Sequence, residues 1–337
     1  MRFRETGATV GFLETGKHNA ITDVADVKVG HHTLIEGDKI RTGVTAILPH
    51  GGNLFTDKVI ASVHTINGFG KAVGFEQVRE LGTIETPILL TNTLNVGKVA
   101  DASIAYMLQA NPDLRSINPI VGECNDGYLN DIHGRHVSQK HVFSVIENAT
   151  NGAVIEGCVG AGTGTSCYGF KGGIGTASRI AGKYNVGVLM QTNFGAMQEL
   201  SILGAPVGFH LENQQIAPTD DGSVMIVIAT DAPLTARQLT RLAHRVPFGL
   251  GRTGTICHHG SGDFVIAFTT NRSEKQLTDD QQININTLFR AVVECVEESI
   301  YNALFMAESM VGHLGNRLPA IPIERTIHWL KYYRRLS

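Results

Sequence analysis

A glycine and a serine at the start of a buried strand are the residues best placed to do chemistry in this sequence. The polar, breaker-rich run ENQQIAPTDDG ends at Gly222, and Ser223 leads into the apolar, β-branched run VMIVIAT of residues 224–230. If the Gly222–Ser223 bond is cut, Ser223 carries both a hydroxyl and a free α-amine. That amine titrates near ~7.7–8.0 and can act as general base for the hydroxyl. The same residues also suit an ordinary turn into a strand.

Further polar positions could complete such a centre. Ser261 lies between glycines in HHGSGDF, and this hydroxyl, with the Asp263 carboxylate two positions later, can orient a neighbouring amine or hydroxyl. Gly262 can offer its N–H at close range. Asn193, in QTNFG, ends an apolar run and carries an amide that can stabilise an oxyanion. Glu123, in VGECNDGYLND, could bind a cationic group of a substrate. Each position also has a structural interpretation, as a turn, an Asx turn or a solvated carboxylate.

The glycine-rich stretch GAGTGTSCYGFKGGIGTAS of residues 160–178 resembles a nucleotide-binding loop only superficially. Its spacing departs from G-x-G-x-x-G, residues 181–187 contain no acid, and no G-x-x-x-x-G-K-[ST] occurs. We therefore expect these glycines to let the backbone pass close to another segment or to a reaction centre.

Metal and cofactor signals are weak. The histidine pairs at 31–32 and 258–259 are adjacent residues, which point to opposite faces of a strand and rarely chelate one ion. No HExxH motif occurs. We expect no metal and no cofactor.

The bulk composition indicates a globular enzyme-sized protein. The chain has 337 residues, 42% of them hydrophobic and 18% charged, with a net charge of −3 and no basic stripe that would favour nucleic acid. No run of about 18 apolar residues could cross a membrane, and the N-terminus lacks the apolar core of a signal peptide. Five cysteines without a CxxC pair favour reduced thiols and a cytoplasmic protein.

Strand-like and helix-like segments alternate along the chain, which predicts a layered α/β architecture. The expected strands include residues 20–30, 43–48, 185–195, 224–230 and 263–270. The expected helices are residues 97–111, 235–246 with Thr235 as N-cap, and 284–310. Composition does not change across 212–222, so we expect one domain, 1–337, with an internal loop.

The chain resembles the DmpA-type L-aminopeptidase/D-esterase family, self-processing serine aminopeptidases that include the β-peptidyl aminopeptidases. The resemblance covers most of the sequence in order. It rests on NAITDVADVKVGH (19–31), TGVTAILP (42–49), ETPILLTNTLNVG (85–97), GECNDGYLND (122–131), GTGTSCYGFKGGIGTASR (162–179), VGVLMQTNFG (186–195), GSVMIVIATDAPL (222–234) and GSGDFVIAF (260–268).

This resemblance implies a four-layer αββα sandwich, similar in layout to the N-terminal-nucleophile hydrolases but different in connectivity. It implies a precursor cleaved between Gly222 and Ser223 into an α chain (1–222) and a β chain (223–337) that stay in one domain. It also implies a homo-oligomer, a tetramer of such heterodimers.

The resemblance further implies a role for each polar position. The roles are the nucleophile with its amine as base, the serine that hydrogen-bonds and orients that centre, the nearby carboxylate (a glutamate in some members), the two oxyanion donors, and the acid that binds the substrate amine. In that order they fall on Ser223, Ser261, Asp263, Asn193, Gly262 and Glu123.

The implied substrates are short peptides, amino acid amides or esters with a free amine, and β-peptides are included. Two alternatives stay open. One is an acyltransferase of the ornithine acetyltransferase type, which uses threonine where this chain has Ser223. The other is an inactive binding relative, which the intact set of polar positions argues against.

Overall fold

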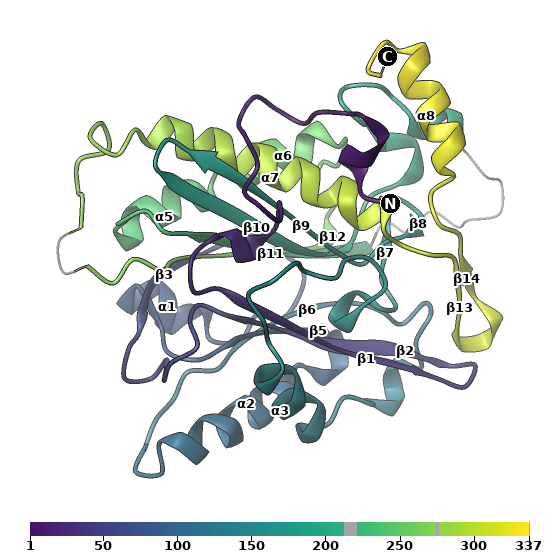
Figure 1. The fold of residues 1–337 in the computed structure, drawn as a ribbon. Helices are drawn as coiled ribbons and strands as arrows, with labels where there is room; N and C mark the ends of the chain where they lie inside the picture. Colours follow the sequence, from purple (N-terminus) through teal and green to yellow (C-terminus); the bar gives the residue numbers. More distant parts are fainter. Residues whose placement is uncertain (212–220, 274–275, 337) are drawn as a thin grey trace.

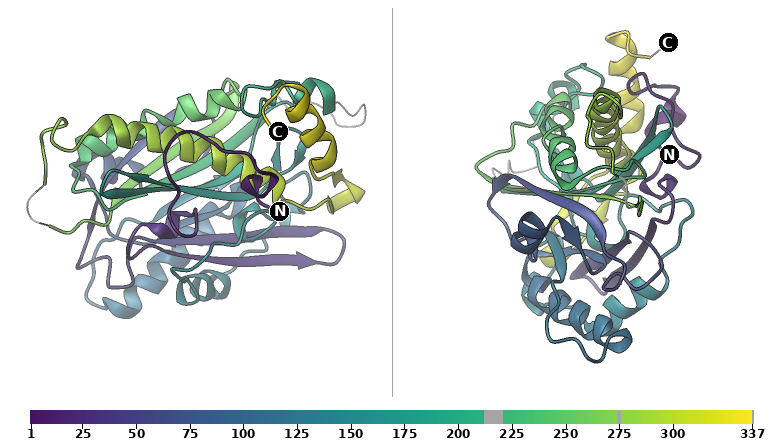
Figure 2. Two further views of the ribbon diagram at one scale, coloured as in Figure 1. Left: turned by 45° about the horizontal axis from the view of Figure 1, so that its top comes forward. Right: turned by 90° about the vertical axis from the view of Figure 1, so that its left-hand side faces the viewer.

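Two β-sheets lie face to face between two layers of helices in the computed structural model, which describes residues 1–211, 221–273 and 276–336 (Figure 1). The expected four-layer αββα sandwich is therefore confirmed. Figure 2 shows the same layers edge-on, with the helices outside and the two sheets inside.

The larger sheet has six strands in the order β4-β3-β12-β11-β10-β9. Its strands are β3 (Val59–Gly68), β4 (Thr83–Ile84), β9 (Ile174–Ala181), β10 (Tyr184–Asn193), β11 (Asp221–Thr230) and β12 (Gly260–Thr269). The smaller sheet has the order β1-β2-β5-β6. Its strands are β1 (Lys28–Glu36), β2 (Ile40–Leu48), β5 (Ile88–Asn92) and β6 (Ile120–Cys124).

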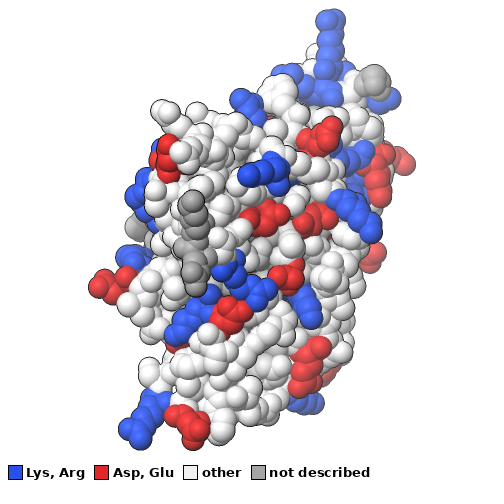
Figure 3. Space-filling model, turned by 60° about the vertical axis from the view of Figure 1, so that its left-hand side comes forward, with Lys and Arg blue, Asp and Glu red and all other residues white. Residues whose placement is uncertain are grey.

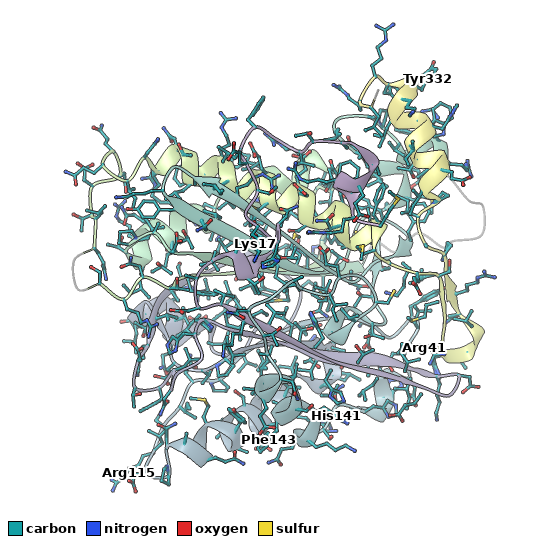
Figure 4. All side chains as sticks on the ribbon, in the orientation of Figure 1. Lys17, Arg41, Arg115, His141, Phe143 and Tyr332 are labelled. Carbon is teal, nitrogen blue, oxygen red and sulfur yellow. The ribbon has the colours of Figure 1, made fainter. Side chains whose placement is uncertain are left out.

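Helices cover the outer face of each sheet. Against the larger sheet pack α5 (Ala236–Ala243) and α7 (Ile285–Phe305), and α6 (Val246–Arg252) packs on α7. Against the smaller sheet pack α2 (Val96–Ala110) and α3 (Gln139–Glu147). His141 of α3, labelled in Figure 4, stacks on His32 of β1 with ring centroids 4.6 Å apart. The remaining helices are α1 (Phe75–Leu81), α4 (Gly208–Leu211) and α8 (Ile323–Tyr332).

Strand β11 shows how the sequence pattern builds this architecture. Side chains alternate across a strand, so Ile226 and Ile228 pack toward the helices, whereas Met225 and Val227 pack between the sheets. A strand that is buried on both faces is apolar throughout, which explains why the run from residue 224 to 230 is unbroken. A third apolar core lies between the smaller sheet and helices α2 and α3.

Two short hairpins lie outside the two main sheets. Strands β7 (Ser166–Cys167) and β8 (Phe170–Lys171) form one, and β13 (Met310–Val311) and β14 (Arg317–Leu318) form the other. Arg41 of β2, labelled in Figure 4 beside this second hairpin, donates from Nε to the Val311 carbonyl at 2.9 Å.

The expected strand at residues 20–30 is wrong in its first half. Residues Ile21–Asp23 form the short 3-10 helix η2, and the strand begins only at Lys28. The cause is local, because the Asp23 carboxylate accepts the backbone N–H groups of His18 and Ala20 at 2.8 and 3.1 Å. An aspartate bonding its own backbone in this way competes with a strand ladder.

Two expected helices have different ends. Thr235 caps α5 as expected, because its side chain accepts the N–H of Gln238. The helix stops at Ala243, and Pro247 lies in the first turn of a separate helix, α6. Helix α7 stops at Phe305, five residues before the expected end at Met310. Hydrophobic periodicity marks the buried face of a helix but does not show where the backbone leaves it.

Charged side chains of both signs are interspersed on the face drawn in Figure 3, and neither sign forms a continuous stripe there. Within the described ranges, no helix combines the length and the apolar character needed to cross a membrane.

Candidate active site

The strand ends of both sheets surround a cavity of about 300 Å³. Ser223 and Asn193 reach it from the larger sheet, and Glu123 and Asn125 reach it from the end of β6 in the smaller sheet. Residues far apart in the chain therefore meet at one opening. The structure brings three of the polar positions expected from the sequence into this cavity: Ser223, Asn193 and Glu123.

Ser223 is the third residue of strand β11 and not, as the sequence suggests, at its start. Strand β11 begins at Asp221, not at residue 224, so Gly222 and Ser223 already pair with their neighbours in the ladder. Ser223 lies between Asn193 of β10 and Gly262 of β12. Its side chain is buried, and Oγ accepts the backbone N–H of Asn125 at 3.2 Å. The run at 212–220 that precedes it lies outside the described residues.

Asn193 and Ser223 are directly opposite each other in the antiparallel pair β10–β11, so their side chains project from the same face of the sheet. The Asn193 Oδ1 accepts both the backbone N–H and the hydroxyl of Ser166, each at 3.1 Å. Among the described residues, Nδ2 donates to no protein atom, which leaves it available beside the serine hydroxyl.

Ser261 and Asp263 form a buried pair on the other face of the same sheet. The Ser261 hydroxyl donates to Asp263 Oδ1 at 2.6 Å, and Asp263 Oδ2 is buried with no hydrogen-bond partner within the described residues. Ser261 is the register partner of Gly222 across β11–β12. Burial raises the pKa of the Asp263 carboxyl above its ordinary value, while the bond from Ser261 opposes that rise. The pair therefore lies against the Gly222 side of the Gly222–Ser223 bond.

Glu123 is held at the cavity wall by two donors. The backbone N–H of Lys71 donates to Oε1 at 3.1 Å, and the Thr93 hydroxyl donates to Oε2. Burial raises the pKa of Glu123, whereas these two bonds and the nearby Lys71 charge lower it. A carboxylate with these partners can accept a cationic group from a substrate.

Two thiols close to the candidate site residues, Cys257 and Cys124, are kept in their neutral form. Burial raises the pKa of Cys257 to about 12, and the adjacent Asp263 carboxylate adds to the rise. Burial also raises the pKa of Cys124 well above its ordinary value. Because a thiolate, not a thiol, is the nucleophile, these cysteines are poor competitors for Ser223.

The glycine-rich stretch passes close to other backbone segments, as expected. A Cβ on Gly162 would lie 2.5 Å from the Ile174 nitrogen, and one on Gly164, which lines the cavity, would lie 2.1 Å from the Arg41 carbonyl oxygen. In the part of the chain that the structure describes, no group of three His, Cys, Asp or Glu side chains is arranged to hold a metal ion.

Gly222 has little room for a side chain. A Cβ there would lie 3.1 Å from the Ser261 hydroxyl and 3.2 Å from the Asn193 carbonyl oxygen. We expect Gly222→Ala to slow any cleavage after residue 222 by roughly tenfold, because overpacking costs about 1–3 kcal/mol. Intact mass followed over time measures this, with Gly251→Ala, where no atom lies within 4 Å of the added methyl, as control. An unchanged cleavage rate would contradict the role of close packing.

Sequence reasoning missed the residues that hold the polar groups in place. Asn125, Thr93 and Ser166 each contact one of the expected site residues. Thr93 had a usable signal: it follows β5, and Glu123 lies near the end of β6, a strand parallel to β5. Because the carboxyl ends of neighbouring parallel strands lie at the same edge, residues just beyond them can meet. Ser166 had no such signal.

The fold and the cavity fit a hydrolase that uses a serine. The sequence matches the model of Peptidase family S58 over residues 19–318, and the chain belongs to that family. It is therefore a serine-type aminopeptidase.

Individual relatives agree with this assignment. The chain is 40% identical to the β-peptidyl aminopeptidase BapA of Sphingosinicella microcystinivorans, over 96% of this chain and 90% of that protein. Its structure is similar to that of a Pyrococcus horikoshii OT3 protein, with a TM-score of 0.92, 46% identity and 99% of each chain covered. It is also similar to the L-aminopeptidase D-Ala-esterase/amidase of Ochrobactrum anthropi, with a TM-score of 0.90, 37% identity and coverage of 100% and 99%. That enzyme is described as a variant of the N-terminal-nucleophile hydrolase fold.

Proposed function

We propose that this aminopeptidase matures itself by cutting the Gly222–Ser223 bond, and that the freed Ser223 then removes N-terminal residues from short peptides, amino acid amides or esters. The observation that carries the proposal is the cavity in which the buried Ser223 hydroxyl, the Glu123 carboxylate and the Asn193 amide nitrogen meet, the last without a partner among the described residues. Membership in Peptidase family S58 supports the same activity.

Maturation begins when the Ser223 oxygen attacks the carbonyl carbon of Gly222. The C–N bond breaks as the serine oxygen forms an ester, and the proton lost by the hydroxyl ends on the new α-amine of Ser223. Water then hydrolyses the ester, leaving a carboxylate on Gly222 and restoring the hydroxyl. The Ser261–Asp263 pair beside Gly222 can receive the new amine, since Asp263 Oδ2 is buried without a partner among the described residues.

Turnover uses the same oxygen on a new carbonyl. The α-amine of Ser223 takes the hydroxyl proton as Ser223 attacks the first amide or ester carbonyl of the substrate, then passes it to the leaving group. The developing oxyanion lies against Asn193 Nδ2 and the N–H of Gly262, donors from the two strands that flank Ser223. Water finally hydrolyses the acyl-enzyme.

The proposed substrate class includes β-peptides, because the chain is 40% identical to a β-peptidyl aminopeptidase. A pocket discriminates only weakly against one extra methylene in the substrate backbone. Both α- and β-linked substrates can therefore bind in this cavity. Glu123 binds the free amine in either case.

Two measurements test the proposed function. Intact mass of the purified protein should show two chains that meet at Gly222–Ser223, and the protein should release p-nitroaniline from aminoacyl and β-aminoacyl anilides without added metal. A single uncut chain that still turns over would reject maturation. Loss of turnover with a chelator would show that a metal carries the chemistry.

Replacing Glu123 by glutamine should lower the preference for free-amine over N-acetylated anilides by about 10–100-fold, because a charge-assisted bond to the substrate ammonium is lost. In the unchanged enzyme this preference should decline as the pH falls, since protonation removes the Glu123 charge. Burial places that loss at a pH above the ordinary range of a glutamate. Glu147→Gln, on the surface of α3, is the matched control. An unchanged preference would reject the role.

We further propose that the two products, 1–222 and 223–337, remain one domain and assemble as a tetramer of heterodimers in the cytoplasm. The sheet order supports the first point, because β11 and β12 lie between β10 and β3, which come from the other product. The five free cysteines favour a reducing compartment. Light scattering of the processed protein measures the assembly, and a monomeric heterodimer would contradict it.

A further inference from the structure

The glycine-rich stretch of residues 160–178 has no role in the chemistry described so far, although it is the most unusual stretch of the sequence. We propose that Ser166, in this stretch, is the positioning residue of the oxyanion hole, and that the buried Lys171 fixes the loop that carries it. The proposal rests on the oxyanion role of Asn193 given under the proposed function.

Asn193 can help an oxyanion only in one orientation of its side-chain amide. The two ends of the amide have nearly the same shape, but Nδ2 donates hydrogen bonds and Oδ1 accepts them. With the amide reversed, an oxygen lone pair would face the developing negative charge and destabilise it. The catalytic value of Asn193 therefore depends on whatever decides between these orientations.

Ser166 selects the orientation of the Asn193 amide with two hydrogen-bond donors. Its backbone N–H and its hydroxyl both donate to Asn193 Oδ1, each at 3.1 Å. The backbone N–H cannot accept a hydrogen bond, so in the reversed amide it would face another N–H. Oδ1 is thereby kept on Ser166, and Nδ2 is turned away from it. Both residues line the cavity, where Nδ2 has no other partner within the described ranges.

The hairpin β7–β8 places Ser166 at this position. Ser166 pairs with Lys171 inside the hairpin, and the next residue, Cys167, forms a bridge with Phe194 just past the end of β10. The Tyr168 N–H also donates to the Phe194 carbonyl at 2.8 Å. The hairpin is therefore bonded to the same strand end that carries Asn193.

Lys171 holds the loop from inside. Its side chain is fully buried, and Nζ donates to the carbonyl oxygens of Gly162, Thr165 and Gly172 at 3.1, 2.8 and 2.7 Å. One ammonium therefore joins three backbone segments around Ser166. All three of its N–H donors are used by backbone carbonyls, so this lysine is not available to bind a phosphate. The motif acts as a structural scaffold.

The glycines let the scaffold close. A Cβ on Gly172 would lie 2.6 Å from the Ser166 carbonyl oxygen, and one on Gly173 would lie 1.9 Å from the Gly157 carbonyl oxygen. Real Cβ atoms do not approach backbone oxygens so closely. The density of glycine in this stretch thus follows from the tight packing around Ser166 and the buried lysine.

Isosteric variants at position 166 separate the hydroxyl from the volume of the side chain. Ser166→Thr keeps both donors, whereas Ser166→Val has the same shape as threonine and keeps only the N–H. We expect the valine variant to have a kcat about fivefold lower than the threonine variant, with KM within twofold, because one of two bonds orienting the amide is lost. Rates are taken per processed chain, counted by intact mass, and thermal unfolding checks each fold. Ser144→Ala, on α3, is the control.

The Asn193→Ala background decides whether Ser166 acts through Asn193. In that background the threonine and valine variants should differ by less than twofold, since the amide they orient is gone. Equal kcat for the two variants in the Asn193 enzyme, or the same ratio in both backgrounds, would overturn the proposal. If Asn193→Ala itself keeps full kcat, the oxyanion assignment of Asn193 falls, and the positioning role of Ser166 falls with it.

Discussion

A Ser223→Ala protein is expected to remain one chain of 36.3 kDa on a denaturing gel and to release no p-nitroaniline above the uncatalysed rate. The substitution removes the only atom that attacks in both maturation and turnover, so both should fail together. A loss of at least about 10⁴-fold is expected, as for other enzymes whose covalent nucleophile is deleted. Intact mass and anilide turnover on the same sample measure the two effects.

Ser144→Ala, the same chemical change on the outer helix α3, should be cut and active like the unchanged protein. A Ser223→Ala chain that is still split between residues 222 and 223 would show that another group attacks the bond. A chain that stays whole but keeps turnover would show that a different nucleophile serves the substrate.

An Asn193→Ala enzyme should lose about 10²–10³ in kcat with KM within a few-fold, because Nδ2 bonds the charged oxygen more strongly than the ground-state carbonyl. Asn193→Asp should be at least as slow, since a carboxylate would place negative charge next to the oxyanion. Steady-state kinetics per processed chain provide the measurement. We expect these variants to mature slowly for the same reason, so the cleaved fraction must be counted first.

Asn148→Ala, an exposed asparagine next to the end of α3, is the matched control and should keep the full kcat. A rise in KM at unchanged kcat in Asn193→Ala would contradict the oxyanion role and indicate that Asn193 only binds the substrate. A similar loss in the Asn148 control would point to a general loss of stability.

Much of the fold could be predicted because buried strands and helices leave strong local patterns. The run from residue 224 to 230 is apolar on both faces, and the structure places it in the middle of the larger sheet. The strand expected at residues 185–195 corresponds to β10, and the helix expected at 97–111 corresponds to α2. Each of these segments is determined by contacts that repeat every two or every three to four residues.

The predicted element boundaries were wrong where a local side-chain bond or a long-range strand pairing determined the backbone conformation. Where a strand was expected, residues 21–23 form a 3-10 helix, because the Asp23 carboxylate bonds the nearby backbone. Strand β11 begins before its apolar run, because Gly222 and Ser223 pair with residues of β12 that lie almost 40 positions later. Such pairings leave no periodic trace in the residues themselves.

By itself, the sequence determined the layered α/β class, the family resemblance and the identity of Ser223, Asn193 and Glu123 as candidates, because each rests on residue types and local order. The tertiary structure alone decided which of them meet. It brought Ser223, Asn193 and Glu123 into one cavity, put Ser261 and Asp263 on the opposite face, and set Ser166 against the Asn193 amide. These outcomes depend on strand register and on backbone packing between segments distant in the chain, which only the folded chain specifies.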